Sequence, residues 1–189
     1  MGDMILTIVL AVVLLFLVGL LIWLVIVYNN IVRLRNSIDK SWANIDVLLL
    51  QRSSEIPNVV ATVKGYMKHE RETLETLTKA RSFLSNAKTM SQKAAADNII
   101  SETIKTVFAV AENYPDLKAV ENFLQLQKRI TGLENELADR REFYNDSVMI
   151  YNTRIQSFPD LLVSRMMNFT AVELFKASEE DRQYVRVNL

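Results

Sequence analysis

The feature that most constrains this chain is a run of twenty-five residues without a charged side chain, from Met4 to Tyr28. Nineteen of them are Leu, Ile, Val or Phe. As a helix the run measures roughly 37 Å, which is enough to cross a hydrocarbon core of ~30 Å. Its apolar side chains favour membrane insertion by roughly 6–11 kcal/mol. A helix that is apolar on every face also lacks the polar side of a surface helix. We therefore predict that residues 1–28 form a transmembrane anchor.

A cleaved signal peptide is the alternative interpretation of this run. Such a peptide has a basic start, a shorter apolar stretch and small residues before the cleavage site. Here Asp3 is the only charged side chain before the run, which ends in Val-Ile-Val-Tyr-Asn-Asn. Trp23 and Tyr28 lie toward one end, where aromatic rings favour the membrane interface. A retained anchor fits these features better.

Basic residues flank only one side of the apolar run. Arg33, Arg35 and Lys40 follow it directly, whereas no Lys or Arg precedes it. By the positive-inside rule we predict a single-pass protein of the cell membrane, with a short N-terminus outside and the C-terminal part in the cytoplasm. The absence of Cys removes disulfides and thiol-bound metals from consideration.

The rest of the chain has the pattern of an all-α protein. Lys plus Arg and Asp plus Glu are equal at 22 each, a balance that argues against nucleic-acid binding. Beyond the anchor Gly and Pro are sparse, and apolar residues recur at helical spacing between them. We predict an elongated, antiparallel up-and-down bundle of about four helices over 29–178, followed by a loose C-terminal tail over 179–189.

Apolar spacing predicts helices over 31–49, 56–84, 91–111 and from 115 to about 155, with a short helix near 161–167. Pro57 separates the first two predicted helices, because proline lacks an amide donor and disfavours helix in the residue before it. The chain can reverse there or only bend. We favour the reversal, because it lets four helices cover one another, although the apolar stripe continues across Pro57 almost in register.

Residues that could carry chemistry are few. The only histidine, His69, stands in a highly charged segment and lacks the Glu three residues earlier that a di-metal bundle site requires. Four scattered glycines cannot form a phosphate-binding loop. We therefore expect no catalytic residue, no cofactor-binding residue and no metal ligand, and predict that the protein is not an enzyme.

A Tyr-Asn dipeptide recurs in the chain, at Tyr28-Asn29, Tyr144-Asn145 and Tyr151-Asn152. The last two lie a heptad apart, a spacing typical of coiled-coil packing, with Phe158 a further seven residues on. One interpretation is aromatic packing with the hydroxyls reaching water. The other pairs the two asparagines with polar groups on the first helices, for which the candidates are Asn44, Asp46, Arg52 and Asn58.

Gly65 and Gly132 are expected inside helices, where each costs about 1 kcal/mol relative to Ala. Close approach of another backbone, either within the bundle or between protomers, would compensate for that cost.

Several longer segments carry a resemblance to a known family. They are Tyr28-Asn-Asn-Ile-Val-Arg-Leu-Arg-Asn36, Trp42-Ala-Asn-Ile-Asp-Val47, Ile56-Pro-Asn-Val-Val60, Glu112-Asn-Tyr-Pro-Asp-Leu-Lys-Ala119, Glu121-Asn-Phe-Leu-Gln-Leu-Gln127 and Arg140-Arg-Glu-Phe-Tyr-Asn145. Together they resemble the LemA family of membrane-anchored proteins, over nearly the whole chain up to about Phe175. The sequence departs from the family pattern at Ser53-Ser54-Glu55, where members usually carry a more basic stretch.

The resemblance implies a helical bundle on one N-terminal membrane helix, and some relatives are associated with magnetosome membranes. Our leading hypothesis is a non-enzymatic, membrane-anchored scaffold or membrane-organising protein. Its expected partners are the lipid bilayer and another protein or a second copy, without nucleic acid. The alternatives are a sensor that binds a lipid or small molecule between its helices, and an accessory subunit of a membrane protease or transporter.

Overall fold

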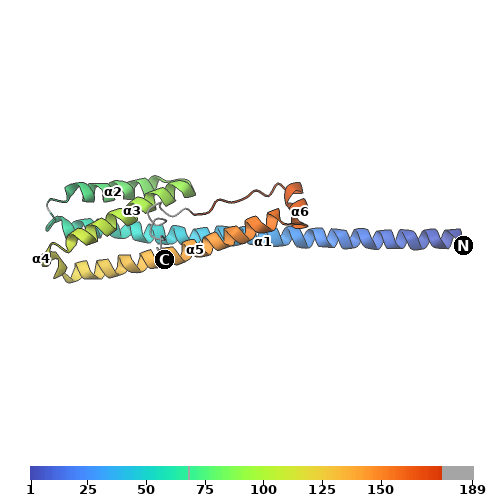
Figure 1. Cartoon of the computed structure of the whole chain (residues 1–189), viewed down its shortest axis with the longest axis horizontal. Helices are drawn as coiled ribbons and strands as arrows, with labels where there is room; N and C mark the ends of the chain where they lie inside the picture. Colours follow the sequence, from blue (N-terminus) through green and yellow to red (C-terminus); the bar gives the residue numbers. More distant parts are fainter. Residues whose placement is uncertain (68, 176–189) are drawn as a thin grey trace, which may run out of the picture. The chain divides into compact units, whose positions relative to one another are not determined.

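The computed structural model describes residues 1–67 and 69–175. The regular secondary structure of this part is entirely helical (Figure 1), which confirms the predicted all-α class. The helices are α1 (Gly2–Lys64), α2 (Arg71–Asn86), α3 (Met90–Ala111), α4 (Pro115–Lys118), α5 (Glu121–Gln156) and α6 (Asp160–Met166). The tail predicted over 179–189 lies outside the described residues.

The chain packs as two compact units, and each is described by itself. The first comprises Met1–Lys40 with Asp146–Glu173. The second comprises Ser41–Asn145 with the described residues Leu174 and Phe175. Helices α1 and α5 each contribute to both units, because their bounds extend past residues 40 and 145.

The second unit contains the up-and-down bundle. Four helical segments alternate in direction, namely the later part of α1, α2, α3 and the first part of α5 (Figure 1). Their buried side chains follow the helical period, so each segment turns one apolar stripe inward. The buried stripe of α1 includes Ile45, Leu49, Ile56, Val59 and Val63, and that of α5 includes Phe123, Ile130, Leu137 and Tyr144.

The predicted reversal at Pro57 is wrong. Helix α1 continues through Pro57 and ends at Lys64, and the chain turns in the following segment, which begins with Gly65. Ile56, Val59 and Val63 are all buried, so the apolar stripe that crosses Pro57 in register packs as one helix face. The packing of this continuous stripe outweighs the local cost of proline, which is about 3 kcal/mol in a helix interior.

A side chain compensates for the amide that Pro57 lacks. A helical residue 57 would donate its N–H to the carbonyl of Ser53, four residues earlier. Proline has no N–H, so that carbonyl loses its helical donor. Nε of Arg81, on α2, donates to the Ser53 carbonyl oxygen at 3.2 Å instead. Ser53 is buried, and an unsatisfied carbonyl there would be costly.

This compensation predicts a coupling between Arg81 and Pro57. Arg81→Met should lower the free energy of unfolding by about 1–2 kcal/mol, because it leaves the Ser53 carbonyl without a donor. In a Pro57→Ala background the new backbone N–H satisfies that carbonyl, so the same substitution should cost much less. Urea unfolding of the four proteins in mild detergent measures the coupling, and strictly additive effects would contradict it.

The other helix boundaries confirm the sequence prediction in part: the single helix predicted from 115 to about 155 is wrong, since it is divided into α4 and α5 at Ala119 and Val120. Helix α3 begins at Met90, one residue before the predicted start, behind a capping box formed by Thr89 and Gln92. Pro115 occupies the first turn of α4, where its missing N–H costs nothing. The predicted second helix over 56–84 is wrong, since α1 ends at Lys64 and α2 begins only at Arg71. The predicted short helix near 161–167 corresponds to α6.

The two glycines differ from the prediction. Gly65 directly follows α1 instead of lying inside a helix, whereas Gly132 does lie within α5. A Cβ added at either position would meet nothing within 4 Å. Close backbone approach within the described chain therefore does not explain either glycine, so that part of the prediction is wrong, whereas approach between protomers stays a prediction.

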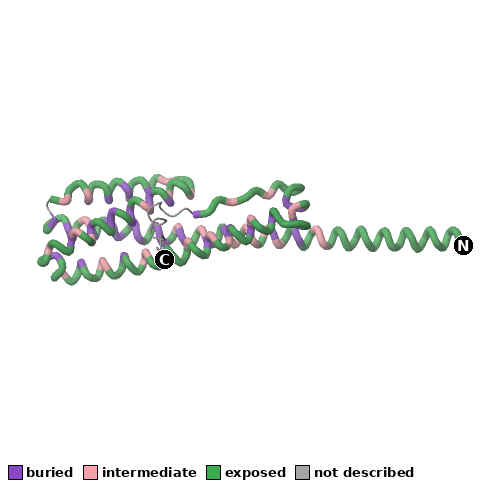
Figure 2. The backbone as a smooth tube through the Cα atoms, viewed as in Figure 1, coloured by how far each residue is buried: buried purple, intermediate pink, exposed green. Residues whose placement is uncertain are grey.

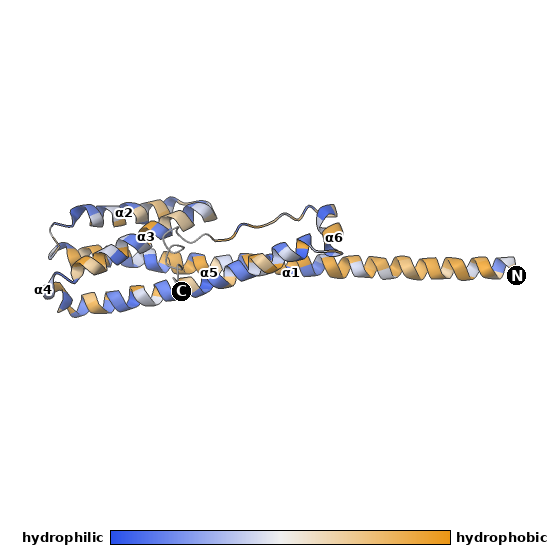
Figure 3. Cartoon of the chain, in the orientation of Figure 1, coloured by the Kyte–Doolittle hydropathy of each residue, from blue (hydrophilic) through white to orange (hydrophobic). Residues whose placement is uncertain are grey.

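The first unit combines the apolar run with a small packed region. Side chains of α1 are exposed along nearly all of the run (Figure 2), although they are the most hydrophobic of the chain (Figure 3). Burial begins at Val27 and continues at Ile31 and Ile38. On α5 the buried residues of this unit are Val148, Tyr151 and Ile155. Among the described helices, α1 alone is long and apolar enough to cross a membrane.

Candidate functional site

The most unusual feature of the second unit is a charge network inside its core. On α1 every seventh residue from Ile31 is buried, through Ile38, Ile45, Arg52 and Val59. Arg52 therefore occupies a position where isoleucine or valine stands elsewhere in the series. Asp97 lies in the same way on α3, where Ile104 and Ala111 follow at seven-residue intervals and are buried.

Arg52 connects three helices through its guanidinium group. Its Nη1 donates to Oδ1 of Asp97 on α3 at 2.8 Å. Its Nη2 lies 2.9 Å from Oγ of Ser101 on α3 and 2.7 Å from Oε2 of Glu134 on α5. This geometry holds α1, α3 and α5 in one relative register, because a shift of any one by a turn would separate the groups.

Two further contacts complete the network. The second oxygen of the Asp97 carboxylate, Oδ2, pairs with Arg141 on α5. The Ser101 hydroxyl donates to Oε1 of Glu134 at 3.0 Å. Two guanidinium groups thus face two carboxylates, and the formal charge of the network is zero.

Burial dominates the electrostatics of the two central groups. Arg52 and Asp97 are each at most 1% exposed. Desolvation raises the pKa of the Asp97 carboxyl, while the charges of Arg141 and Arg52 act in the opposite direction. Desolvation likewise lowers the pKa of Arg52, against the charges of Asp97 and Glu134. Each charge is therefore stabilised mainly by its partners, and removing either one takes a counter-charge away from the other in a core where water cannot replace it.

A cleft opens beside the network on the side of α3 and α5. Its volume is about 180 Å³. Polar groups of Arg52, Ser101 and Glu134 line it together with the apolar side chains Ile104, Phe108 and Ile130. Nε of Arg52 is buried and has no hydrogen-bond acceptor among the described residues.

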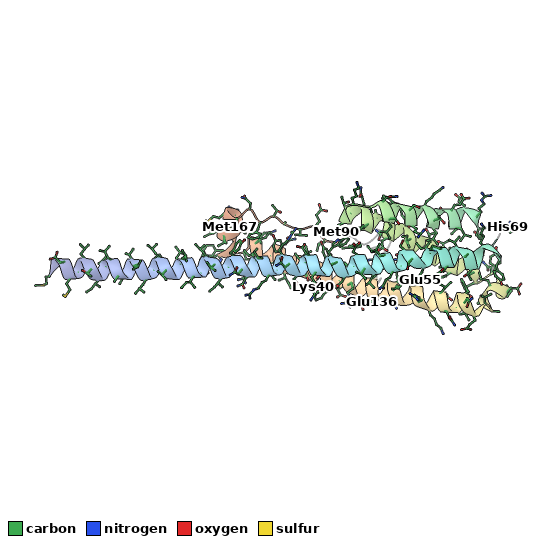
Figure 4. The ribbon with its side chains drawn as sticks, turned by 180° about the vertical axis from the view of Figure 1, so that it is seen from behind. Lys40, Glu55, His69, Met90, Glu136 and Met167 are labelled. Carbon is green, nitrogen blue, oxygen red and sulfur yellow. The ribbon has the colours of Figure 1, made fainter. Side chains whose placement is uncertain are left out.

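The network carries no evident catalytic arrangement. Ser101 is the one nucleophile in it, and its hydroxyl is engaged with Arg52 and Glu134 rather than with a general base such as histidine. His69 lies exposed in the segment between α1 and α2, in a turn rather than within the helix predicted over 56–84 (Figure 4). No group of three or more potential metal ligands occurs in the described residues.

The Tyr-Asn pair of the second unit confirms the aromatic packing of the first interpretation, since the ring of Tyr144 lies 6.0 Å from that of Trp42, but its polar contacts match neither interpretation. Tyr144 is fully buried, and its hydroxyl contacts Sδ of Met90 at 3.1 Å rather than water. The Asn145 amide bonds both backbone groups of Phe175: Nδ2 donates to its carbonyl at 3.2 Å, and Oδ1 accepts its N–H at 2.8 Å. Asn145 therefore holds the backbone at Phe175, the last of the described residues.

The same arrangement recurs in the first unit. Tyr151 is buried, and its hydroxyl donates to the Thr170 carbonyl at 3.1 Å. Nδ2 of Asn152 donates to the Val172 carbonyl at 2.8 Å, and Oδ1 accepts the Val172 N–H at 2.9 Å. Phe158 is 81% exposed and lies beyond the end of α5, so its predicted packing with the two tyrosines is wrong.

The predicted partners of the two asparagines are engaged elsewhere. Asp46 pairs with Lys93, Arg52 belongs to the core network, and Asn58 donates to Glu55. Asn44 is exposed. An asparagine amide matches one N–H and one C=O of an extended backbone, as in a sheet, and helix α1 offers no such free pair. The pairing of Asn145 and Asn152 with the first helices was therefore wrong.

Sequence reasoning named Arg52 but missed Asp97, Glu134 and Arg141. The signal for Arg52 was present, because a charge interrupts a seven-residue series of β-branched residues. Glu134 and Arg141 carried no such signal. Both stand among other charged residues on α5, and only the folded bundle shows which of these side chains point into the core.

Comparison with known proteins defines the class to which this fold and site belong. The model of the LemA family matches residues 41–189. The chain therefore belongs to the LemA family, as the resemblance of its segments predicted.

Individual relatives agree with this assignment. Protein LemA of Metamycoplasma hominis is 29% identical over 159 residues, which cover 82% of this chain and 71% of that protein. Magnetosome protein MamQ 1 of Paramagnetospirillum magneticum is 27% identical over 81 residues, or 43% of this chain and 30% of that protein. Magnetosome protein MamQ of Magnetospirillum gryphiswaldense is 25% identical over 80 residues, or 42% and 29%.

Proposed function

We propose that this protein is a non-enzymatic, single-pass membrane protein whose helical bundle acts as a scaffold that organises the membrane or the proteins on it. The observation that carries the proposal is the exposed apolar run of α1. None of the residues in its most apolar eighteen-residue window is buried. Apolar surface of this extent is stable in water only when something covers it, and a bilayer is the cover that its length and composition fit.

The charge distribution around the run supports an orientation. Arg33, Arg35 and Lys40 follow it, and Asp3 precedes it. This asymmetry favours a cytoplasmic bundle with the N-terminus outside. The similarity to two proteins named as magnetosome proteins supports a role in membrane organisation.

The anchor is tested by introducing charged residues into the apolar run. Leu10→Arg, Leu14→Arg and Val18→Arg together should oppose insertion by roughly 7–10 kcal/mol, about as much as the run favours it. We expect the triple variant to leave the membrane fraction in alkaline carbonate, whereas the wild type stays. Leu50→Arg, at an exposed position of the same helix, is the matched control. An intact wild-type chain in the soluble fraction would contradict the anchor.

The scaffold role is tested separately by crosslinking in intact cells. A groove of about 730 Å³ between the end of α1 and α2 offers one place for a protein partner, with Met67 and Leu74 in its lining. Photoreactive residues at Lys64 and Lys79 on its lining are compared with one at Arg140 on α5. Discrete adducts from the groove positions support a scaffold, and their mass spectrometry distinguishes a second copy from a protease or transporter subunit. Absence of any adduct would contradict the scaffold.

A small-molecule sensor is the second candidate, favoured by the cleft beside Arg52. Nε of Arg52, which has no acceptor among the described residues, and the neighbouring apolar side chains suit a small ligand that has both an acceptor and an apolar part. Native mass spectrometry of the protein released from membranes would reveal such a ligand. Thr131→Phe narrows the cleft, so it should abolish binding of this ligand while α1 stays anchored in the membrane.

A further inference from the structure

The first unit carries a second apolar surface outside the transmembrane run. Four bulky side chains after α5 point away from the packed region: Phe158, Leu162, Met166 and Met167, which are 81%, 54%, 68% and 51% exposed. Phe158, Leu162 and Met166 recur every four residues. The opposite side of α6 is buried through Asp160, Val163 and Ser164. Helix α6 therefore has one side against the unit and one apolar side with no cover among the described residues.

Specific contacts hold α6 in place, so its outward side is defined. The Ser164 hydroxyl is 2.7 Å from the carbonyl oxygen of Ile155, on α5. The carboxylate of Asp160 pairs with Arg154 on α5. After α6, the N–H of Phe169 donates to the Ser164 carbonyl at 2.9 Å. These bonds join α6 to the end of α5 and to the segment that follows it.

The same segment contacts the end of the apolar run. The ring of Phe169 lies 5.9 Å from the ring of Tyr28, the last residue of the run. Val27 is already buried, and Trp23 and Leu24 are half-buried. The packed region of this unit therefore begins alongside the final turns of the run.

This contact determines the depth at which α6 lies. The run measures roughly 37 Å as a helix and the hydrocarbon core ~30 Å, so its final turn extends into the headgroup layer. Tyr28 and Trp23 suit that layer, as aromatic side chains do at membrane boundaries. Elements that pack against Tyr28 lie at the same depth. Arg165, exposed beside Met166, adds a positive charge suited to lipid phosphate.

We propose that Phe158 and α6 form a second membrane contact, which lies in the headgroup layer and inserts Phe158, Leu162, Met166 and Met167 at its boundary with the acyl chains. The contact rests on the proposed anchoring of α1 in the bilayer. The contact fixes the rotation of α1 about its own axis, and it fixes the position of the end of α5 relative to the lipid surface. A single spanning helix by itself fixes neither.

The absence of Cys makes a site-specific test possible in the full-length protein. Leu162→Cys and Met166→Cys are each labelled with the fluorophore NBD and reconstituted into phosphatidylcholine–phosphatidylglycerol vesicles that contain lipids with a quencher at a shallow or a deep position. Interfacial helices lie roughly 5–10 Å into the boundary, so the shallow quencher should reduce emission about twofold and the deep quencher less.

Two control positions separate this inference from the anchoring itself. Met149→Cys, on α5 of the same unit and also exposed, should show little quenching by either lipid. Leu15→Cys, in the middle of the run, should be quenched most by the deep lipid. Quenching at Leu15 without quenching at Leu162 and Met166 would overturn the membrane contact of α6 and leave the anchor intact. A lack of quenching at Leu15 would overturn both.

The same test detects the alternative, in which a second copy of the chain covers the outward side of α6. If the α6 side faced another protomer, NBD at Leu162 would be shielded from a water-soluble quencher, unaffected by lipid quenchers, and sensitive to the protein-to-lipid ratio. That outcome would also overturn the proposal.

Discussion

Arg52→Ala should lower the free energy of unfolding of the bundle by about 3–5 kcal/mol, because it removes one of the two cations that balance the buried Asp97 carboxylate and leaves only Arg141. Arg52 bonds Asp97, Ser101 and Glu134 together, and Asp97 has almost no exposure to water through which it could be stabilised. Urea unfolding of the full-length protein in mild detergent, followed by circular dichroism, measures the loss.

Two controls identify the cause of that loss. Arg140→Ala removes a cation from α5 that is 47% exposed and pairs with Glu136 one turn away, so it should change stability by less than about 1 kcal/mol. Arg52→Leu combined with Asp97→Leu removes both central charges and leaves Glu134 with Arg141. This pair of substitutions should recover most of the stability, since apolar replacement of buried ion pairs is often neutral or better. If the double substitution lowered the free energy of unfolding as much as Arg52→Ala does, loss of a buried counter-charge would be refuted as the cause.

Tyr151→Ala should destabilise the first unit by about 3–5 kcal/mol, the usual cost of removing a large buried aromatic side chain. Tyr151 is 1% exposed, its hydroxyl bonds Thr170, and the Arg35 guanidinium lies 5.9 Å from its ring centre. Tyr151→Phe keeps the ring and loses one hydrogen bond, so it should cost only about 1 kcal/mol.

Phe158→Ala is the matched comparison for Tyr151→Ala, since it removes an aromatic ring seven residues further along that is almost fully exposed. In detergent its effect on unfolding should lie within about 0.5 kcal/mol. Equal losses for the two alanine variants would contradict the different placement of these rings. Amide exchange at Val172 and at the residues of α6 reports whether the loss is local to this unit.

The central charges show why sequence reasoning was incomplete. Arg52 interrupts a periodic apolar series, and this conflict with local pattern was visible in the sequence. Asp97 pairs with it from 45 residues away, and Arg141 approaches from a third helix. Which of many surface-type charges turns inward depends on helix rotation and register, and these are set by packing among distant segments.

At Pro57, in contrast, a local sequence signal was present and led to the wrong prediction. Local chemistry argued for a reversal, because proline removes a donor and disfavours helix before it. The apolar stripe argued for continuity. The fold followed the stripe, because burial of Ile56, Val59 and Val63 outweighs one missing hydrogen bond, and because Arg81 supplies the donor from α2. That rescue could not be read from residues near Pro57.

Short-range patterns in the chain were enough to establish the apolar run, the all-α class, the bounds of α3 and the family, since spacing and composition act within one element or one motif. Tertiary packing decided the rest. It selected the partners of Asn145 and Asn152, assembled the core network around Arg52 and Asp97, exposed Phe158, and placed α6 beside the end of the run. Each of these depends on the free energy of bringing distant segments together, to which neighbours in sequence contribute little.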